Sequence, residues 1–180
     1  SLKDIKRVLI SACGTAYFAG RVGEYMLEEY AGIPTEVDFA SEFRYRKPVF
    51  RAGDIFLAIS QSGETADTLA AFREAKEKRV PTLGMVNVVG STLARETDAG
   101  VYKHIGPEIG VASTKAFTSQ VAILALLTLL LGRQREMSLV TGQRIAKELQ
   151  RIPELMRKIL EQSDSIKKLA ELFTKFPTVG

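Results

Sequence analysis

Ser60, Ser62 and Thr65 place three hydroxyl groups within six residues, around a single glycine. They follow the apolar run 55–59 and come just before an alanine-rich helical pattern, 65–78, so a strand, a tight polar turn and a helix are expected. The N-terminus of a helix presents unpaired N–H groups and a partial positive charge, and the hydroxyls add further donors. The alternative is an ordinary N-cap. The clustering favours a phosphate site.

The type of phosphate follows from a missing charge. The turn holds no Lys or Arg between Ser60 and Thr68, unlike a GxxxxGK[ST] loop, where a lysine contacts the nucleotide phosphates. A single phosphate monoester is therefore the better expectation than a nucleoside triphosphate.

A second turn of the same kind occurs near the N-terminus, at Cys13-Gly14-Thr15. It lies between the apolar run 7–12 and a helical pattern at 16–30. We expect Thr15 to cap that helix and Gly14 to allow close approach of the backbone to a ligand. Because the sequence places no base beside Cys13, its thiol is interpreted as a small filler rather than a nucleophile.

A third turn, in the loop 105–116, precedes a long helix, with Ser113 or Thr114 as its expected cap. The body of this helix, 121–131, is almost entirely apolar. Eleven such residues are too few to span a bilayer, which needs about twenty, so a buried core helix ended by Gly132 is expected.

Three titratable residues lie close to this third turn. Glu108 is a candidate general base, and the alternative is that it orients the loop through a hydrogen bond. His104, the only histidine, would act as an acid near pH 7 or play a structural role at the end of the fifth strand. Lys115, in the first turn of its helix, would contact an anion or lie in solvent.

The elements that must position these turns alternate along the chain. Apolar runs alternate with helical segments, which indicates an α/β fold: a three-layer arrangement with a five-stranded parallel sheet and helices on both faces. The runs are 7–12, 35–39, 55–59, 81–89 and 100–104, and the segments between them are 16–30, 40–45, 65–78 and 91–96. With the flavodoxin-like strand order 2-1-3-4-5, the order reverses between the first and third strands, so the first two turns would face one another across the ligand crevice.

The C-terminal part is predicted to be helical. A helical pattern at 138–162 contains Pro153, which predicts a kink or two consecutive helices, and 164–176 is a further amphipathic helix. Residues 177–180 resemble the beginning of another strand. Together with the missing initiator Met, this suggests a fragment of a longer protein.

Charge separates the chain into two parts. Residues 1–132 hold 15 Lys+Arg and 15 Asp+Glu, whereas residues 133–180 hold 10 and 6, so the C-terminal part carries the whole net charge of +4. We expect a binding domain at 1–132 and C-terminal helices at 133–180 that pack on it. Basic and acidic residues alternate in those helices, and aromatic platforms are few, so nucleic-acid binding is not expected. A single cysteine favours a cytoplasmic location.

Three motifs together carry a resemblance: Ser-Ala-Cys-Gly-Thr (11–15), Ser-Gln-Ser-Gly-Glu-Thr-Ala-Asp-Thr (60–68) and Gly-Pro-Glu-Ile-Gly-Val-Ala-Ser-Thr-Lys-Ala-Phe-Thr (106–118). This combination resembles the sugar isomerase (SIS) domain family. Within the family it is most similar to the first of the two SIS subdomains of the isomerising aminotransferases that make glucosamine 6-phosphate from fructose 6-phosphate and glutamine.

The resemblance implies a phosphosugar site with no cofactor and no metal. In the family the Ser-x-Ser-Gly-x-Thr turn holds the phosphate, and the other two turns contact the rest of the sugar. The implied substrate-binding residues are Gly14, Thr15, Ser60, Gln61, Ser62, Thr65, Val111, Ala112 and Ser113. Many members have Ser after Cys-Gly-Thr, whereas this chain has Ala16, so one hydroxyl contact is absent at that edge.

The resemblance also implies partners: a second SIS subdomain, which carries the family's catalytic residues, a glutaminase domain, and a second copy in a homodimer. No membrane association is expected. One alternative is a non-catalytic sugar-phosphate sensor module of a regulator. A dinucleotide binder is disfavoured because the first turn lacks the glycines of GxGxxG, although Asp38 stands at a plausible ribose distance.

Overall fold

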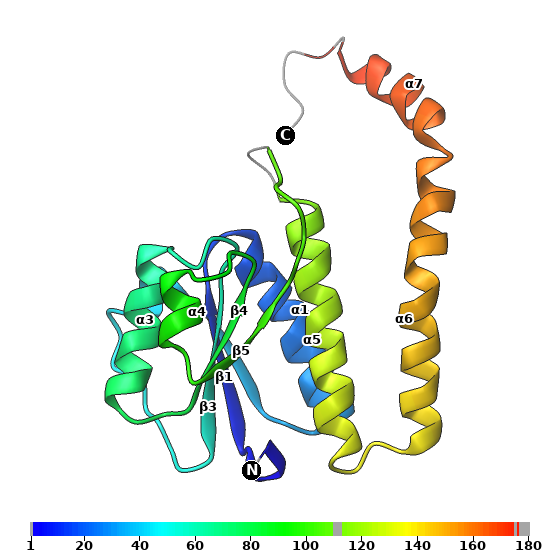
Figure 1. Cartoon of the computed structure of the whole chain (residues 1–180). Coiled ribbons are helices and arrows are strands. Elements are labelled where there is room, and N and C mark those ends of the chain that lie inside the picture. The colour runs from blue at the N-terminus through cyan, green and yellow to red at the C-terminus, as the bar shows by residue number, and fades with distance from the viewer. Residues whose placement is uncertain (1, 110–112, 175, 177–180) are drawn as a thin grey trace. The chain divides into compact units, whose positions relative to one another are not determined.

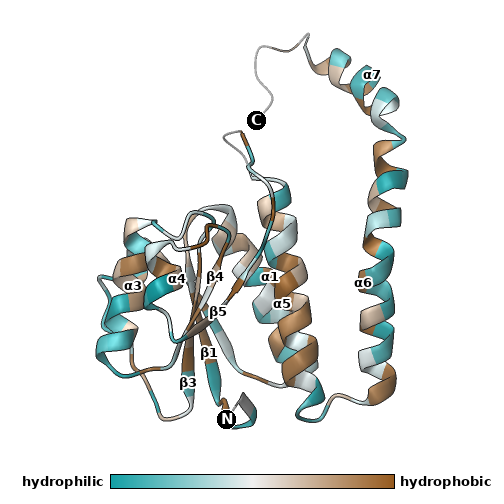
Figure 2. Cartoon of the chain, viewed as in Figure 1, coloured by the Kyte–Doolittle hydropathy of each residue, from teal (hydrophilic) through white to brown (hydrophobic). Residues whose placement is uncertain are grey.

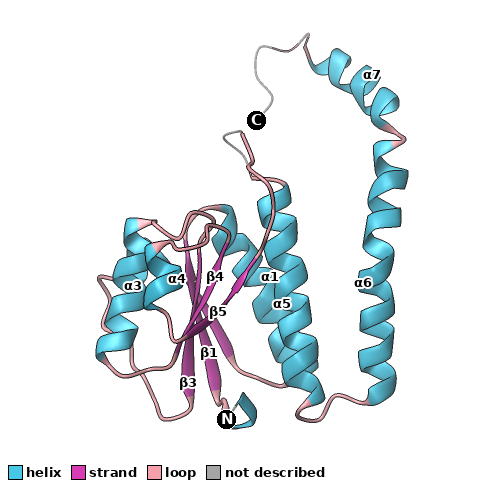
Figure 3. Ribbon diagram, in the orientation of Figure 1, coloured by secondary structure: helices cyan, strands magenta, loops and turns pink. Residues whose placement is uncertain are grey.

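The computed structural model describes residues 2–109, 113–174 and 176, and it divides into two units, 1–139 and 140–180. The first unit is built on a five-stranded parallel sheet (Figures 1 and 3). Its strands are β1 (Arg7–Ala12), β2 (Thr35–Phe39), β3 (Asp54–Ile59), β4 (Thr82–Val86) and β5 (Ala99–Tyr102). The order is β2-β1-β3-β4-β5, which confirms the expected topology.

The register of the sheet brings two turns to one edge. β1 lies between β2 and β3, and its last residue, Ala12, pairs with Ile59, the last residue of β3. Both strands are buried throughout except for partly exposed Arg7, as expected for central parallel strands covered on both faces. The segments that follow β1 and β3 therefore begin side by side at the carboxyl edge.

Helices cover both faces of the sheet. Alternate strand residues point to opposite faces, so each face has its own hydrophobic core. One core is shared with α1 (Thr15–Ala31) and α5 (Lys115–Arg133). The other is shared with α2 (Ala40–Phe43), α3 (Ala66–Glu77) and α4 (Thr92–Glu96). A short 3-10 turn, Leu2–Asp4, precedes β1.

Close packing of α1 against α5 depends on small residues. A Cβ at Gly23 would lie 2.9 Å from Leu124 Cδ1, and one at Gly132 would lie 2.8 Å from the carbonyl oxygen of Tyr30. By length and composition alone α5 would suffice to cross a membrane, although the apolar run within it is shorter. Its residues Leu124 and Leu131 are nevertheless fully buried in the core, which is the position of a core helix.

Some element boundaries differ from those predicted. The fourth strand ends at Val86 and not at residue 89, because Asn87 turns the chain away and its carboxamide pairs with both backbone groups of Ile105, at 2.9 Å each. The fifth strand ends at Tyr102 and not at His104. The α5 helix runs one residue beyond Gly132, whose role is close packing and not helix termination.

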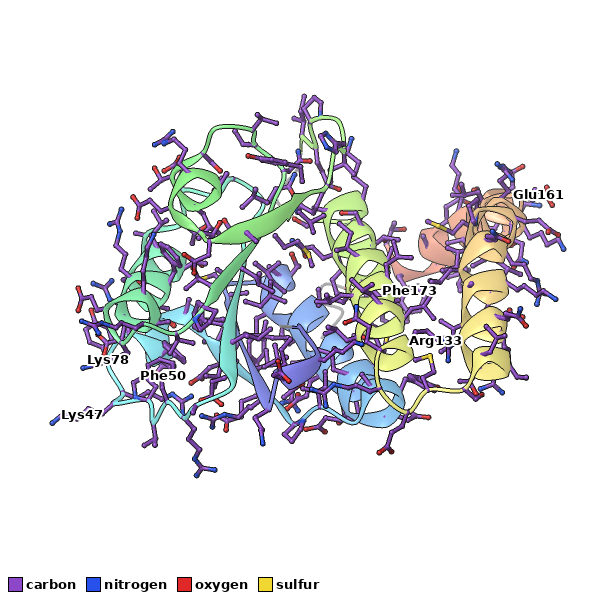
Figure 4. All side chains as sticks on the ribbon, turned by 60° about the horizontal axis from the view of Figure 1, so that its bottom comes forward. Lys47, Phe50, Lys78, Arg133, Glu161 and Phe173 are labelled. Atoms are coloured by element: carbon purple, nitrogen blue, oxygen red, sulfur yellow. The ribbon has the colours of Figure 1, made fainter. Side chains whose placement is uncertain are left out.

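At the amino edge of the sheet, Arg7 forms a partly buried ion-pair network. Its guanidinium lies 2.5 Å from the carboxylate of Asp54, whose side chain is 1% exposed, and 2.6 Å from that of Glu36. Figure 4 shows Lys47, Phe50 and Lys78 on one side of the first unit, with the lysine side chains at its periphery. These basic side chains lie away from the carboxyl edge.

The second unit consists of α6 (Leu139–Leu160), apart from its first residue, and α7 (Ser163–Phe173). Pro153 lies within α6, which is one helix by hydrogen bonding. Apolar and polar residues alternate along α6 and α7 with helical period (Figure 2), and many apolar side chains are exposed, among them Ile159, Leu160, Ile166, Leu169 and Leu172. The strand expected at 177–180 lies outside the described residues.

Candidate functional site

A cavity of about 600 Å³ lies at the carboxyl ends of β1 and β3. Two of the predicted turns, and the loop before α5, contribute to it. Its lining residues are Cys13, Gly14, Thr15, Ala16, Ile59, Ser60, Gln61, Ser62, Thr65, Val88, Ser113 and Gln120. Seven of the nine predicted binding residues are thus brought together, and the other two, Val111 and Ala112, lie outside the described part of the chain.

The turn after β3 is held by its own hydroxyl groups. Ser60 Oγ accepts a hydrogen bond from the N–H of Gly63 and lies 3.0 Å from Thr65 Oγ1. Ser62 Oγ accepts from the N–H of Glu64 at 3.1 Å and is exposed. Thr65 occupies the N-cap position of α3, yet its side chain makes no capping bond. The N–H groups of the first turn of α3 thus lack a side-chain cap and are open to a ligand.

The turn also depends on backbone conformation. Gly63 has φ +70°, and a Cβ there would lie 2.1 Å from Ser91 Oγ, so only glycine fits. The next residue, Glu64, accepts a hydrogen bond at 2.7 Å from the N–H of Thr92, at the start of α4. This bond lowers the pKa of Glu64. The turn is therefore fixed against α4 from the side away from the cavity.

The turn after β1 differs from the prediction in one respect. Gly14, at φ +58°, is the N-cap residue of α1, and Thr15 is the first helical residue. The expected capping by Thr15 is wrong, because its hydroxyl makes no side-chain cap and the helix begins one residue earlier than predicted. Cys13 Sγ lies 3.8 Å from Thr68 Oγ1, the contact of a small packed side chain.

The carboxylate of Glu108 caps the start of α5. Its carboxylate accepts hydrogen bonds from Thr114 Oγ1 at 2.6 Å and from the N–H groups of Thr114, Lys115 and Ala116. The bonds from Thr114 contribute most to lowering its pKa to about 2. The helix is thus capped by Glu108 and not by a hydroxyl of Ser113 or Thr114. This geometry corresponds to the orienting role and leaves Glu108 a poor base.

The other two candidates near this loop also lie apart from the cavity. His104 follows the end of β5 with φ +51° and does not line it. Lys115 donates from Nζ to the carbonyl oxygen of Pro107 at 2.7 Å and is exposed. Neither side chain contributes to the cavity as the structure describes it.

Three lining residues outside the predicted turns were not expected at the site: Ile59 at the end of β3, Val88 and Gln120. Gln120 is 1% exposed, and its Oε1 has no hydrogen-bond partner. It is a long polar side chain near the start of α5 that directly precedes the apolar run 121–131, and a polar residue bordering a core run is the signal that could have found it. Val88 was assigned to a strand, but it follows β4 and reaches the cavity from the turn.

The wall of the cavity carries no full charge. Among its described lining residues there is no Lys, Arg, Asp, Glu or His. Likewise, the described residues contain no cluster of His, Cys, Asp and Glu suited to a metal ion. What the wall offers instead is hydroxyl groups, amides and the N-termini of α1 and α3, which bind an anion but supply no carboxylate or imidazole for proton transfer.

A model of the SIS domain matches residues 1–130, which is most of the chain. The chain belongs to the SIS domain family. The match covers the sheet, α1 to α4, all but the last three residues of α5, and every turn that lines the cavity.

Curated relatives of this SIS domain chain are longer proteins. It is 54% identical over 169 residues to a glutamine–fructose-6-phosphate aminotransferase (isomerizing) of Chlorobaculum tepidum and 49% identical over 172 residues to one of Thermus thermophilus. These alignments cover 94% and 95% of this chain but only 28% of each relative. The C-terminal domain of glucosamine-fructose-6-phosphate aminotransferase from Francisella tularensis has a TM-score of 0.92 and 40% identity, over 96% of this chain and 49% of that one.

Proposed function

We propose that this SIS domain is the sugar-phosphate-binding half of the isomerase part of a glutamine:fructose-6-phosphate aminotransferase. Its ligands would be fructose 6-phosphate and glucosamine 6-phosphate. The observation that carries the proposal is the convergence of Ser60, Ser62, Thr65 and two helix N-termini on one cavity. The chain also shares about half of its aligned residues with enzymes of that name.

The phosphate would bind in the turn after β3. Ser62 and Thr65 would donate hydroxyl hydrogen bonds, and the N-terminus of α3 would supply N–H groups and its positive dipole end. Gln61 would donate from its amide. Gly14, Thr15 and the segment Val111, Ala112 and Ser113 would contact the sugar.

The part of the reaction left to this chain is binding. Making an aminosugar from a ketose phosphate requires a proton to move from C1 to C2, which needs a base within hydrogen-bond reach. The described cavity wall holds no carboxylate or imidazole. We therefore infer that the base and other reacting groups come from a second SIS subdomain, and ammonia from a glutaminase domain, in a cytoplasmic enzyme that acts as a homodimer.

The C-terminal part fits this proposal. We retain residues 1–132 as the binding domain and 133–180 as helices leading to the second subdomain. Exposed apolar residues on both α6 and α7, such as Ile159 and Leu169, would be covered by the remainder of such an enzyme.

The test is ligand-induced stabilisation of the purified chain, with fructose 6-phosphate as ligand and unphosphorylated fructose as control. Ligand at a hundred times its Kd adds about 2.7 kcal/mol, which raises the Tm by a few degrees. A shift with the phosphorylated sugar alone supports the proposal. Equal shifts, or none with either sugar, would contradict it for this chain.

The double substitution Ser62→Ala with Thr65→Ala locates the phosphate. Hydrogen bonds to a charged group contribute about 1.5–3 kcal/mol each, so losing two should weaken binding at least about 100-fold. The matched control is Ser165→Ala with Thr174→Ala, which removes two exposed hydroxyls from α7 and the residue after it. Unchanged affinity in the first double variant would refute the phosphate assignment.

A further inference from the structure

Lys103 is a buried lysine directly behind the cavity wall. It follows β5, and its N–H donates to the carbonyl oxygen of Val86 at 2.9 Å, which fixes its backbone beside β4. The residue is only 8% exposed. Its ammonium group donates a hydrogen bond to Oε1 of Gln61, a residue that lines the cavity. A lysine is almost never buried to this degree without a specific partner.

This hydrogen bond determines which end of the Gln61 amide faces a ligand. An ammonium group can only donate, so it selects the carbonyl end of the carboxamide. The NH₂ end is then left to donate elsewhere. An anion in the cavity needs donors, and a carbonyl oxygen turned toward it would repel it.

The charge of Lys103 also bears on a cavity whose described wall has none. A cation set one residue behind the wall, in a region shielded from water, attracts an anion more strongly than the same charge in solvent. The backbone of Gln61 is held as well, since its carbonyl oxygen accepts from the N–H of Asn87 at 3.2 Å. The amide can therefore act as a fixed link between Lys103 and a ligand.

We propose that Lys103 is the positioning residue of the anion site: it holds the Gln61 amide with its NH₂ toward the phosphate and supplies the positive charge that the wall lacks. This inference rests on the proposed function. It assigns to Lys103 a role in affinity and not in the chemical step.

Such a role should make the affinity for an anion depend on pH. Burial lowers the pKa of Lys103 to about 8, against an opposing influence from Glu108. A bound anion would favour the protonated form, so affinity should fall as the pH rises from 7 to 9.5. The titratable and charged groups on the neighbouring turns and loops are Cys13, Glu64, His104, Glu108 and Lys115. Of these Cys13 lines the cavity, so the pH series is repeated on the parent with Cys13→Ala, and a slope that disappears with the thiol would belong to Cys13 and overturn this inference.

The test compares Lys103→Met, which keeps length and removes charge and donors, with Lys103→Arg and a charge-matched control, Lys78→Met. Lys78 is an exposed residue at the C-terminal end of α3. Affinity for fructose 6-phosphate is measured from pH 7 to 9.5, and Tm without ligand is measured alongside. We expect Lys103→Met to bind at least about tenfold more weakly at pH 7 with a flat pH profile, Lys103→Arg to recover part of the loss, and Lys78→Met to match the parent.

The ligand-free Tm separates positioning from a structural role. Removing a buried charge should leave the Tm at pH 7 equal or higher, so affinity should fall without a loss of stability. Affinity of Lys103→Met within twofold of the parent, or weaker binding explained by a lower Tm, overturns this inference alone. Failure of the parent itself to prefer fructose 6-phosphate over fructose overturns the proposed function, and this inference with it.

Discussion

Gly63→Ala is the substitution whose effect the structure defines best. The added Cβ meets two obstacles: a left-handed backbone at φ +70°, and Ser91, whose Oγ and Cβ would lie 2.1 and 2.6 Å away. A left-handed conformation costs a residue with a Cβ about 1–2 kcal/mol, and overpacking a fixed site costs about 1–3 kcal/mol. We expect a loss of about 3 kcal/mol, which lowers Tm by about 6–12 °C in a domain of this size.

Two further variants separate the cost of the left-handed backbone from the cost of overpacking. Gly32→Ala tests the backbone alone, because Gly32 has φ +61° with nothing within 4 Å of its Cβ position, so about 1–2 kcal/mol should be lost. Ser91→Gly removes both clashing atoms, and since Ser91 Oγ has no hydrogen-bond partner, it should cost little by itself. In the double variant the nearest remaining atom is Val86 Cγ1, at an ordinary 3.5 Å.

The assay is a double-mutant cycle in urea on Gly63→Ala, Ser91→Gly and their combination, with Gly32→Ala alongside. The combination should recover the packing term and match Gly32→Ala. The reasoning is refuted if Gly63→Ala is no worse than Gly32→Ala, or if Ser91→Gly recovers nothing.

Three other outcomes are expected. Arg7→Met should cost about 3–5 kcal/mol in urea unfolding, because it leaves the buried carboxylate of Asp54 unpaired, and adding Asp54→Leu should restore much of the loss; no recovery would contradict this. Gly132→Ala should cost about 1–3 kcal/mol, since its Cβ would lie 2.8 Å from the backbone carbonyl oxygen of Tyr30 in α1, and a neutral result would show that the helices can separate freely. Glu108→Gln should lower Tm at pH 7; because the pKa of Glu108 is lowered to about 2, the gap to the parent should narrow as pH falls below about 4.5, and a constant gap would exclude the carboxylate as its cause.

The strand order and the meeting of the two turns could be predicted from the sequence because they rest on strong local signals. Apolar runs 55–59 and 7–12 end at glycine and hydroxyl residues, and parallel sheets place such turns at one edge. Helix starts were less predictable. Glu108 caps α5 from six residues away in sequence, a contact that depends on the loop conformation, and Asn87 ends β4 through a contact with Ile105.

Gln120 and Lys103 show more clearly what could not be predicted from the sequence. Each is a polar residue with a polar neighbour, Lys103 beside His104 and Gln120 beside Ser119, so the sequence pattern does not distinguish a buried position from an exposed one. Gln120 reaches the cavity because α5 packs against α1, the helix that follows the turn after β1. Lys103 reaches Gln61 because β5 lies at the end of the sheet next to β4. Both roles depend on pairings between segments far apart in the chain, which residue type alone does not specify.

Several of the interactions that hold the site in place lie outside its wall. Glu64 fixes the turn after β3 against α4, Glu108 fixes the loop before α5, and Lys103 holds the amide of Gln61. The described wall itself is uncharged and presents neutral hydroxyl and amide donors beside apolar groups such as Ile59 and Val88. Fixed neutral donors need little reorganisation to accept an anion, whereas a flexible cationic side chain would lose rotamer freedom on binding. It follows that substitutions at these three charged residues should change the affinity for a sugar phosphate without removing a single direct contact to it.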